Sequence, residues 1–309
     1  NWSAVVTYAF TKMAAFADLN VTCLNNPRET EKLVSKAVKL GFETIALCQT
    51  FRLETVKKER KGAAKLTPVN LGNYPAIKDM KKINPRLKVY TRLTVQLDDQ
   101  SQVHQLSSDP VQSHDILAVQ PATEKLFQQA CKTLDVDIIS LDMTERLPFY
   151  LKFPTVNAAI ERGIHFEIVY SSAIRDSSQR KNLISTALDL VVFAKGKNII
   201  ISSGAVNELD FRGPYDIINL GLLFNLKEEQ SKAAITKNCR DVLFRADARK
   251  GTEKSVISGK LLKETAQLLS DKEEGDISEG CTGQSKEQNF DDNDEGDNYE
   301  PKEKKSKVE

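Results

Sequence analysis

Residues 166–202, FEIVYSSAIRDSSQRKNLISTALDLVVFAKGKNIIIS, decide the fold class of this chain. The stretch opens with the apolar run Phe166–Tyr170, which has the length of a strand. Asp176–Ala194 then places apolar side chains along one side of a predicted helix. The stretch closes with Asn198–Ser202, whose consecutive isoleucines are typical of a strand that is covered on both faces. A strand, a helix and a second strand in this order predict a parallel β-α-β unit.

The same alternation continues on both sides of this unit. The other predicted strands are Met13–Leu19, Thr44–Leu47, Lys88–Leu97, Ile116–Val119 and Ile138–Leu141. The other predicted helices are Pro27–Leu40, Glu124–Lys132, Asn157–Arg162, Pro214–Phe224 and Glu228–Asn238. Roughly seven such units over about 230 residues, without a glycine-rich dinucleotide turn, predict an α/β fold of the TIM-like (β/α) barrel type. A doubly wound open sheet is the alternative.

Composition divides the chain into three predicted parts. Residues 13–249 carry the barrel pattern, and residues 1–12 precede Met13 and are predicted to be an extension outside the natural start. Residues 271–300 contain 12 Asp/Glu but only two Lys, with almost no aliphatic side chains. Such a segment cannot bury enough apolar surface to offset its ordering entropy. We therefore predict a disordered acidic tail over residues 250–309.

The charges of the body and of the tail have opposite signs. Of 44 Lys/Arg and 43 Asp/Glu, 11 and 17 lie in residues 246–309, which leaves 33 and 26 in residues 1–245. A basic body with an acidic appendage favours a polyanionic partner. Four lysines near the end form a candidate nuclear import signal, with a solvated charge run as the alternative: Lys302, Lys304, Lys305 and Lys307.

Cysteine usage and hydropathy exclude several classes of protein. The five cysteines are scattered and never form a C-x-x-C pair, which argues against a disulfide framework or a thiolate zinc site and fits a reducing compartment. No stretch of the sequence approaches the roughly 18–20 apolar residues that span a bilayer. We therefore expect no membrane partner.

Signals for catalysis by this chain are weak. Its three histidines form neither an H-x-H nor an H-E-x-x-H pair, and no nucleophile elbow or phosphate-binding loop is present. Asp18, Asp142 and Glu145 fall at predicted strand ends, where carboxylates could hold Mg²⁺. Three scattered acids are a weak signal, so a metal-dependent hydrolase stays the alternative and no metal site is predicted.

Basic residues inside a predicted strand (Arg92) or after predicted strands point to a different chemistry, if the barrel places them at its mouth. In a barrel, these positions fall on the rim at the carboxyl ends of the strands, where helix N-termini also favour anions. Arginine is well suited to bind phosphate oxygens in pairs. The predicted RNA-binding residues are Arg92, Lys125, Arg146, Arg175 and Arg212; ordinary salt bridges with neighbouring acids are the alternative for each.

Several long segments carry a specific family resemblance. They are FADLN (16–20), TRLT (91–94), AVQPATEKLFQQAC (118–131), LDVDIISLDMTERLPFYLKFPTVNAAIERGIHFEIVYSSAIRDS (134–177), GKNIIISSGA (196–205) and RGPYDIINLGLLF (212–224). In these segments the chain resembles the thirty-kilodalton protein subunit of nuclear ribonuclease P and ribonuclease MRP. The resemblance covers about Met13 to Arg249, nearly the whole predicted barrel.

The resemblance implies a TIM-like barrel related to metal-dependent phosphoesterases. This sequence departs from that group at Asp18-Leu19-Asn20, where a His-x-His ligand pair would stand. The resemblance and the missing ligand pair together imply a chain that is not an enzyme by itself and binds no cofactor. In ribonuclease P the RNA subunit cleaves the 5′ leader of precursor tRNA with Mg²⁺. A free-standing phosphoesterase barrel is the alternative.

The resemblance also implies partners and a location. The expected partners are the catalytic RNA of ribonuclease P, the RNA of ribonuclease MRP acting in rRNA processing, precursor tRNA indirectly, and other protein subunits, including a small pairing partner. A second copy of this chain in the particle is left open. The expected location is the nucleus and nucleolus.

Overall fold

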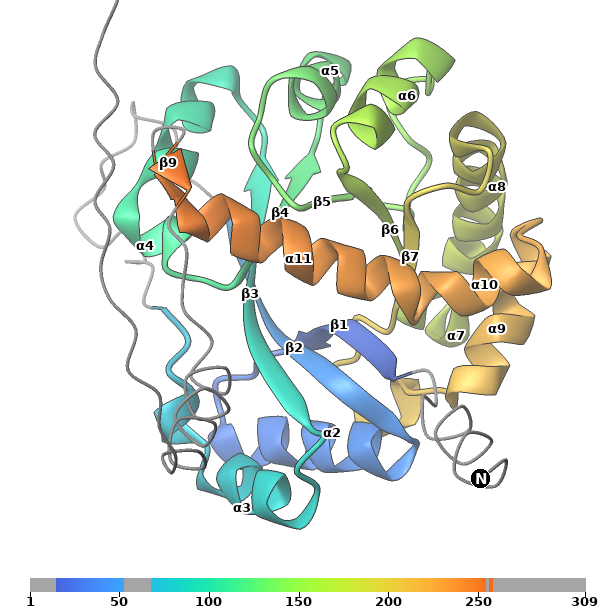
Figure 1. Cartoon of the computed structure of the whole chain (residues 1–309). Helices are drawn as coiled ribbons and strands as arrows, with labels where there is room; N and C mark the ends of the chain where they lie inside the picture. The colour runs from blue at the N-terminus through green and yellow to red at the C-terminus, as the bar shows by residue number, and fades with distance from the viewer. Residues whose placement is uncertain (1–14, 53–67, 254–255, 258–309) are drawn as a thin grey trace, which may run out of the picture. The chain divides into compact units, whose positions relative to one another are not determined.

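A computed structural model describes residues 15–52, 68–253 and 256–257 of the chain. The predicted extension, residues 1–12, lies outside the described residues, as does the tail beyond residue 257 with Lys302, Lys304, Lys305 and Lys307. Strands and helices alternate around a barrel (Figure 1). No helix within the described part is long and apolar enough to cross a membrane.

The sheet contains seven parallel strands, hydrogen-bonded to each other in their order along the chain. They are β1 (Phe16–Thr22), β2 (Phe42–Arg52), β3 (Lys88–Leu97), β4 (Ile116–Pro121), β5 (Ile138–Ser140), β6 (His165–Val169) and β7 (Ile199–Ser202). A doubly wound sheet would reverse its strand order in the middle. The sequential order therefore confirms the predicted TIM-like barrel and excludes the open sheet.

The barrel closes where the segment after β7 meets β1. Gly204 N–H donates to the carbonyl oxygen of Asn20 at 2.8 Å, and Thr22 N–H donates to that of Ala205 at 3.1 Å. Gly204 has a φ of +60°, and a Cβ at this position would lie 2.3 Å from Cγ1 of Val169. Only glycine tolerates both the positive φ and the close approach. The glycine thus allows the two edges of the sheet to join.

Helices cover the outer face of the sheet, and the main apolar core lies between the two layers (Figure 1). The helices are α2 (Pro27–Lys39), α3 (Pro75–Ile83), α4 (Asp109–Gln112), α5 (Glu124–Lys132), α6 (Phe153–Glu161), α7 (Ser171–Arg175), α8 (Ser177–Ala194), α9 (Pro214–Leu223), α10 (Glu228–Ala234) and α11 (Lys237–Gly251). Prolines in the first turn begin α2, α3, α6 and α9, because this position has no hydrogen bond to lose. Short 3₁₀ helices and a two-stranded ribbon complete the described chain: η2 (Leu71–Asn73), η3 (Gln100–Ser107), η4 (Glu208–Asp210), β8 (Thr252–Glu253) and β9 (Val256–Ile257).

The structure differs from the sequence predictions mainly at element ends. β2 continues to Arg52, five residues beyond the predicted strand Thr44–Leu47. Asp176 is not the first residue of the long helix but its N-cap, since its carboxylate accepts a hydrogen bond from Ser178 N–H at 2.6 Å. The last predicted helix divides into α10 and α11, and α11 extends two residues beyond Arg249.

Helix α11 closes the barrel at the amino ends of the strands (Figure 1). Apolar side chains that fill the interior here pack against the buried face of α11, which presents Cys239, Val242 and Ala246. The interior side chains are Ala17, Leu19, Ala46, Ile116, Ala118, Ile138 and Ile200. Arg249 holds the end of the helix through Asp137, with both side chains almost completely buried. One end of the barrel is thus closed by a helix packed against an apolar layer.

Candidate functional site

The barrel interior becomes polar toward the carboxyl ends of the strands. Arg92 on β3 and Glu167 on β6 have no exposed side-chain surface and form an ion pair across the interior. Nη1 and Nη2 of Arg92 each donate to one carboxylate oxygen of Glu167 at 2.5 Å. Two parallel charge-assisted hydrogen bonds of this kind fix both side chains in place. The pair leaves neither charge available to a partner.

Neighbouring polar side chains extend this pair into a network. Asn20 Nδ2 and Ser202 Oγ donate to Glu167 Oε1 at 3.3 Å and 2.5 Å, and Arg92 Nε donates to Thr94 Oγ1 at 3.1 Å. Burial alone would raise the pKa of Glu167, but the charge of Arg92 and the hydrogen bonds from Arg92 and Ser202 hold that pKa below its usual value. Glu167 is therefore a carboxylate at neutral pH.

Asp18 lies beside this network, and its pKa is shifted in the direction opposite to that of Glu167. Its Oδ1 accepts hydrogen bonds from the backbone N–H of Asn20 at 3.1 Å and of Ser203 at 3.2 Å, while the buried Oδ2 has no partner among the described residues. Burial raises the pKa of Asp18, and the negative charge of Glu167 adds to the rise. The side chain is thus biased toward its neutral form, which suits a structural carboxyl better than a metal ligand.

The donor set does not fit a divalent metal ion. Both oxygens of Glu167 are already occupied, Asp18 is biased toward protonation, and the guanidinium of Arg92 supplies the local positive charge. Asp142 and Glu145, the other carboxylates considered from the sequence, are exposed in the loop after β5. In the described ranges, no three His, Cys, Asp or Glu side chains come close enough to hold a metal ion.

The three histidines are dispersed over the barrel. His104 is exposed in η3, whereas His114 and His165 are buried. Burial lowers the pKa of His114 and takes that of His165, the first residue of β6, to about 4. Both buried rings are therefore neutral at physiological pH. His114 follows the short helix α4, and its Nδ1 lies 3.2 Å from the carbonyl oxygen of Pro110 in that helix.

The prediction that Arg92 lies on the rim is wrong. Its position on a strand is correct, but its side chain points into the barrel and has no exposed surface. A side chain with no exposed surface cannot contact the phosphates of a partner RNA. Arg92 is therefore an internal counter-ion of Glu167 and not a surface contact.

The other four predicted RNA-binding residues do lie on the surface near the carboxyl ends of the strands. Lys125 and Arg146 are exposed and form no ion pair with any described residue. Arg175 lies 3.7 Å from Asp210, and Arg212 donates to the carbonyl oxygens of Leu209 and Phe211. Two of the four cations are thus partly engaged within the chain.

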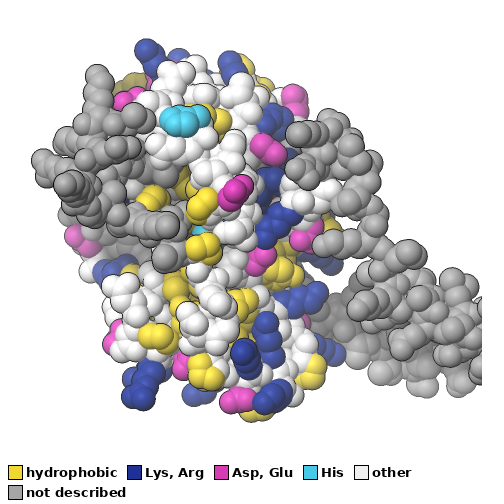
Figure 2. Space-filling model, turned by 90° about the vertical axis from the view of Figure 1, so that its left-hand side faces the viewer, with side chains coloured by type: hydrophobic (Ala, Val, Ile, Leu, Met, Phe, Trp, Pro, Cys, Tyr) yellow, Lys and Arg dark blue, Asp and Glu magenta, His cyan; other side chains and the backbone are white. Residues whose placement is uncertain are grey.

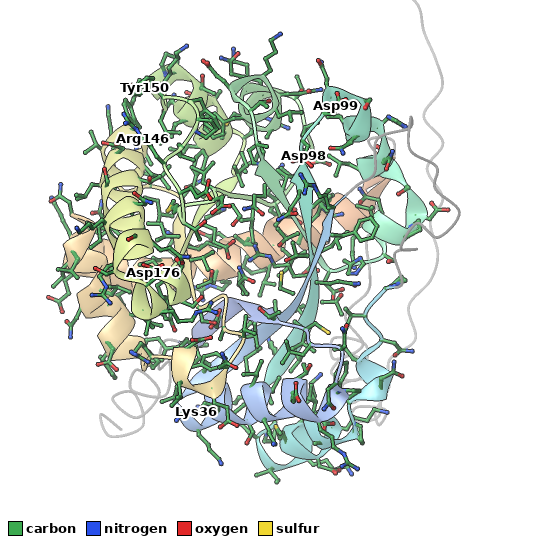
Figure 3. All side chains as sticks on the ribbon, turned by 180° about the vertical axis from the view of Figure 1, so that it is seen from behind. Lys36, Asp98, Asp99, Arg146, Tyr150 and Asp176 are labelled. Carbon is green, nitrogen blue, oxygen red and sulfur yellow. The ribbon has the colours of Figure 1, made fainter. Side chains whose placement is uncertain are left out.

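This rim carries charges of both signs. Figure 3 shows the barrel from the side opposite α11, with Arg146 and Tyr150 in the loop after β5. Asp98 and Asp99 follow β3 on the same rim, and Asp176 follows α7. The rim as a whole is therefore not a continuous positive surface.

The sequence interpretation missed the partner of Arg92. A charged residue inside each of two otherwise apolar strands, TRLT and HFEIV, is a signal that could have suggested a buried pair. It also missed Arg245 and Arg249 on α11, which donate to Val136 O and to Asp137. No local pattern signals the roles of these arginines, because their partners lie more than a hundred residues away.

Comparison with known proteins identifies the family. A family model described as RNase P subunit p30 matches residues 15–251, which includes every strand of the barrel. The chain belongs to the RNase P subunit p30 family. The match spans the same residues that build the barrel and its closing helix.

Individual relatives agree with the family match. A ribonuclease P protein subunit p30 of Mus musculus is 43% identical over 248 residues, with 80% of this chain and 91% of the mouse protein covered. A probable ribonuclease P protein subunit 3 of Schizosaccharomyces pombe is 35% identical, with 79% and 99% covered. A ribonuclease P/MRP protein subunit of Saccharomyces cerevisiae is 27% identical, with 78% and 83% covered.

A solved structure supports the fold. A chain in the cryo-EM structure of archaeal ribonuclease P with mature tRNA superposes with a TM-score of 0.58. The alignment covers 79% of this chain and 98% of the archaeal chain at 15% sequence identity. The barrel architecture is thus shared with a chain whose sequence has diverged widely.

Proposed function

We propose that this p30-family chain is a protein component of ribonuclease P that does not carry out the cleavage itself. The observation that carries the proposal is the closed Arg92–Glu167 pair, which occupies the polar interior of a barrel whose relatives are named as ribonuclease P subunits. A substrate would need open space and free catalytic groups at this position. Hydrolysis of the 5′ leader of precursor tRNA then falls to the RNA subunit with its Mg²⁺ ions.

The chain would assist by placing positive charge near RNA phosphates. Folding a large RNA brings phosphates together, and each cation delivered to them releases counterions and lowers their repulsion. The exposed rim cations Lys125, Arg146 and Arg175 and the half-buried Arg212 are suited to this role. Because Lys125 and Arg146 have no ion-pair partner in the described ranges, they are the stronger pair of contacts.

The family also suggests particular partners and a location. We propose that the chain pairs with a small protein subunit and joins both the ribonuclease P particle and the ribonuclease MRP particle, which processes rRNA. A second copy of the chain in one particle is compatible with this assembly. Nuclear and nucleolar residence would follow, with Lys302, Lys304, Lys305 and Lys307 as the import signal.

Affinity purification of the full-length tagged chain tests the proposal. Sequencing of the co-purified RNA should recover the RNA subunits of ribonuclease P and ribonuclease MRP, and the eluate should remove the 5′ leader from precursor tRNA. A nuclease treatment that destroys the RNA should abolish the activity. Recovery of an active chain free of RNA would instead support a phosphoesterase, the alternative that the closed barrel interior disfavours.

A further inference from the structure

A second concave surface lies at the opposite end of the barrel from the rim. It is a cavity of about 530 Å³ between α11 and the beginnings of β1, β2 and β3, which we call the amino-end hollow. Its polar and aromatic walls include Glu43, Arg86, Lys88, Tyr90 and Arg240. A volume of this size is enough for one nucleotide.

The amino-end hollow has an excess of positive charge that the described residues do not neutralise. Three of its lining residues are cations, Arg86, Lys88 and Arg240, and one is an acid, Glu43. Lys88 and Arg240 are exposed and form no ion pair with any described residue. Arg86 reaches Glu43 only at 3.9 Å. Two full charges are therefore available to an anion from outside.

Three later cations of the closing helix are, in contrast, held by partners within the chain. Arg245, Arg249 and Lys250 are all engaged by carbonyl oxygens or by Asp135, Asp137 and Asp115. They hold α11 onto the barrel. Arg240, one to three turns earlier on the same helix, has no such partner among the described residues, and neither does Lys237 at the start of the helix.

Tyr90 gives the hollow an apolar, planar wall. It is half-buried at the start of β3, and no hydrogen bond of its hydroxyl group to a described residue is present. Burial raises the pKa of Tyr90, with smaller effects of Asp247 and Asp115, so the ring carries no charge at neutral pH. Proteins that bind single-stranded nucleic acids combine these two features. Their aromatic rings stack on the bases, and their cations contact the phosphates.

The positive surface continues outside the hollow along α3. Lys78, Lys81 and Lys82 follow one another on this helix, and the chain leads from it through Arg86 to Lys88. Figure 2 shows the side of the molecule that lies on the left in Figure 1. Lys and Arg side chains gather over its lower part, where α3 lies. Asp79, which lies 2.9 Å from Lys82, is the acid that offsets part of this charge. The phosphate backbone of a nucleic acid strand that leaves the hollow would run past these lysines.

We propose that the amino-end hollow binds an unpaired nucleotide of a single-stranded RNA segment, with its base against Tyr90 and the flanking phosphates at Lys88 and Arg240. The inference deepens the proposed function, because it assumes that the partner is RNA. It adds a contact at the end of the barrel opposite the rim. A rigid duplex cannot place a base in such a cavity without unpairing, so single strands are preferred.

Fluorescence anisotropy with the full chain and a labelled single-stranded oligouridylate tests the site. Lys88→Gln/Arg240→Gln should reduce the slope of log K against log salt by about 1.4, at roughly 0.7 for each phosphate contact of a single strand. The matched control is Lys132→Gln/Lys181→Gln, which removes two exposed lysines of α5 and α8 and should leave the slope unchanged.

Substitutions of Tyr90 test the stacking contact separately. Tyr90→Leu should weaken binding of the single strand by about 5- to 150-fold, whereas Tyr90→Phe, which keeps the ring, should bind like the wild type. A duplex of the same length should bind more weakly than the single strand and should respond to neither variant.

Wild-type binding by Lys88→Gln/Arg240→Gln, or an equal loss in the control variant, would overturn the site. So would full displacement of the RNA by an acidic peptide at equal charge, which would indicate a protein partner. The oligonucleotide assay does not need the particle. The inference can therefore fail while the ribonuclease P RNA still co-purifies, and it can hold while that RNA is absent.

Discussion

The buried cation inside the barrel and two exposed cations at its amino end differ in whether the chain pairs them. Toward the carboxyl ends of the strands, the most deeply placed cation, Arg92, is bound by Glu167 and shielded from solvent. At the amino ends, Lys88 and Arg240 line a concave surface without an ion-pair partner in the described ranges. The difference shows that pairing, and not the number of basic residues, decides which charges a partner can use.

The largest expected effect follows from breaking the closed pair. Arg92→Met leaves Glu167 buried without its counter-charge, which should lower the free energy of unfolding by roughly 5 kcal/mol, the upper end for a broken buried pair. Urea denaturation followed by circular dichroism measures the loss. The double variant Arg92→Met/Glu167→Leu should recover most of it, because two apolar side chains of similar volume replace the pair.

The same pair has a defined pH dependence. The folded-state pKa of Glu167 lies below the ordinary value of 4.5. Its contribution to stability is thus present above the unfolded-state pKa and is lost as the pH falls through the lower folded-state value. Glu167→Gln should remove this acid-side loss. Wild-type stability of Arg92→Met at pH 7 would contradict the closed pair.

A smaller loss is expected at the closing helix. Arg249 donates to Asp137, to Gln112 Oε1 and to the carbonyl oxygen of Asp115. Arg249→Met should cost roughly 3 kcal/mol, since it leaves the buried Asp137 unpaired. Limited proteolysis should then cleave within α11 first. Lys250→Met, next to it but more exposed, is the control and should cost less than about 1 kcal/mol.

Substitution of Asp18 should change the free energy of unfolding by an amount that depends on pH. Burial raises its folded-state pKa above 3.8, so wild-type stability falls as the pH rises from the unfolded-state pKa through the folded-state value. Asp18→Asn imitates the neutral acid and should not show that fall. The difference in unfolding free energy between the two proteins should therefore favour Asp18→Asn more at pH 8 than at pH 4. An unchanged difference across this range would show that Asp18 does not titrate as inferred.

The smallest effect on stability is expected at the exposed rim. Lys125→Gln/Arg146→Gln should change the unfolding free energy by less than about 0.5 kcal/mol for each residue, because neither side chain has an ion-pair partner in the part of the chain that the structure describes. In a reconstituted particle, the variant should still weaken RNA association and raise the Mg²⁺ requirement. A quadruple variant would replace Arg175 and Arg212 by Gln as well. If this variant associated with RNA like the wild type, the rim would not be part of the RNA interface.

Much of the fold could be predicted from the sequence because its signals are local. The isoleucines of Asn198–Ser202 and the periodicity of Asp176–Ala194 predict a strand and a helix without any knowledge of the rest of the chain. The order of the strands follows once the β-α-β units repeat. The extent of α11 was less clear, because its arginines are stabilised by distant partners such as Asp137.

The site could be predicted only in part. The residue type of Arg92 suggested a phosphate contact, but its direction depends on the strand register, and its partner Glu167 lies 75 residues away. The amino-end hollow had no sequence signal, since Lys88, Tyr90 and Arg240 come together only when α11 closes the barrel. Lys125 and Arg146 were correctly expected on the surface, and their contact with RNA stays a prediction.

The most direct test is to assay the isolated full-length chain for metal binding and hydrolysis. Isothermal titration with Mg²⁺ and Mn²⁺ and incubation with precursor tRNA and simple phosphate esters address the closed barrel interior. We predict no tight binding of either ion and no turnover, because Arg92 and Glu167 neutralise each other where a metal would have to bind. Metal-dependent turnover that disappears in Asp18→Asn would contradict this prediction and would make the barrel itself the catalyst.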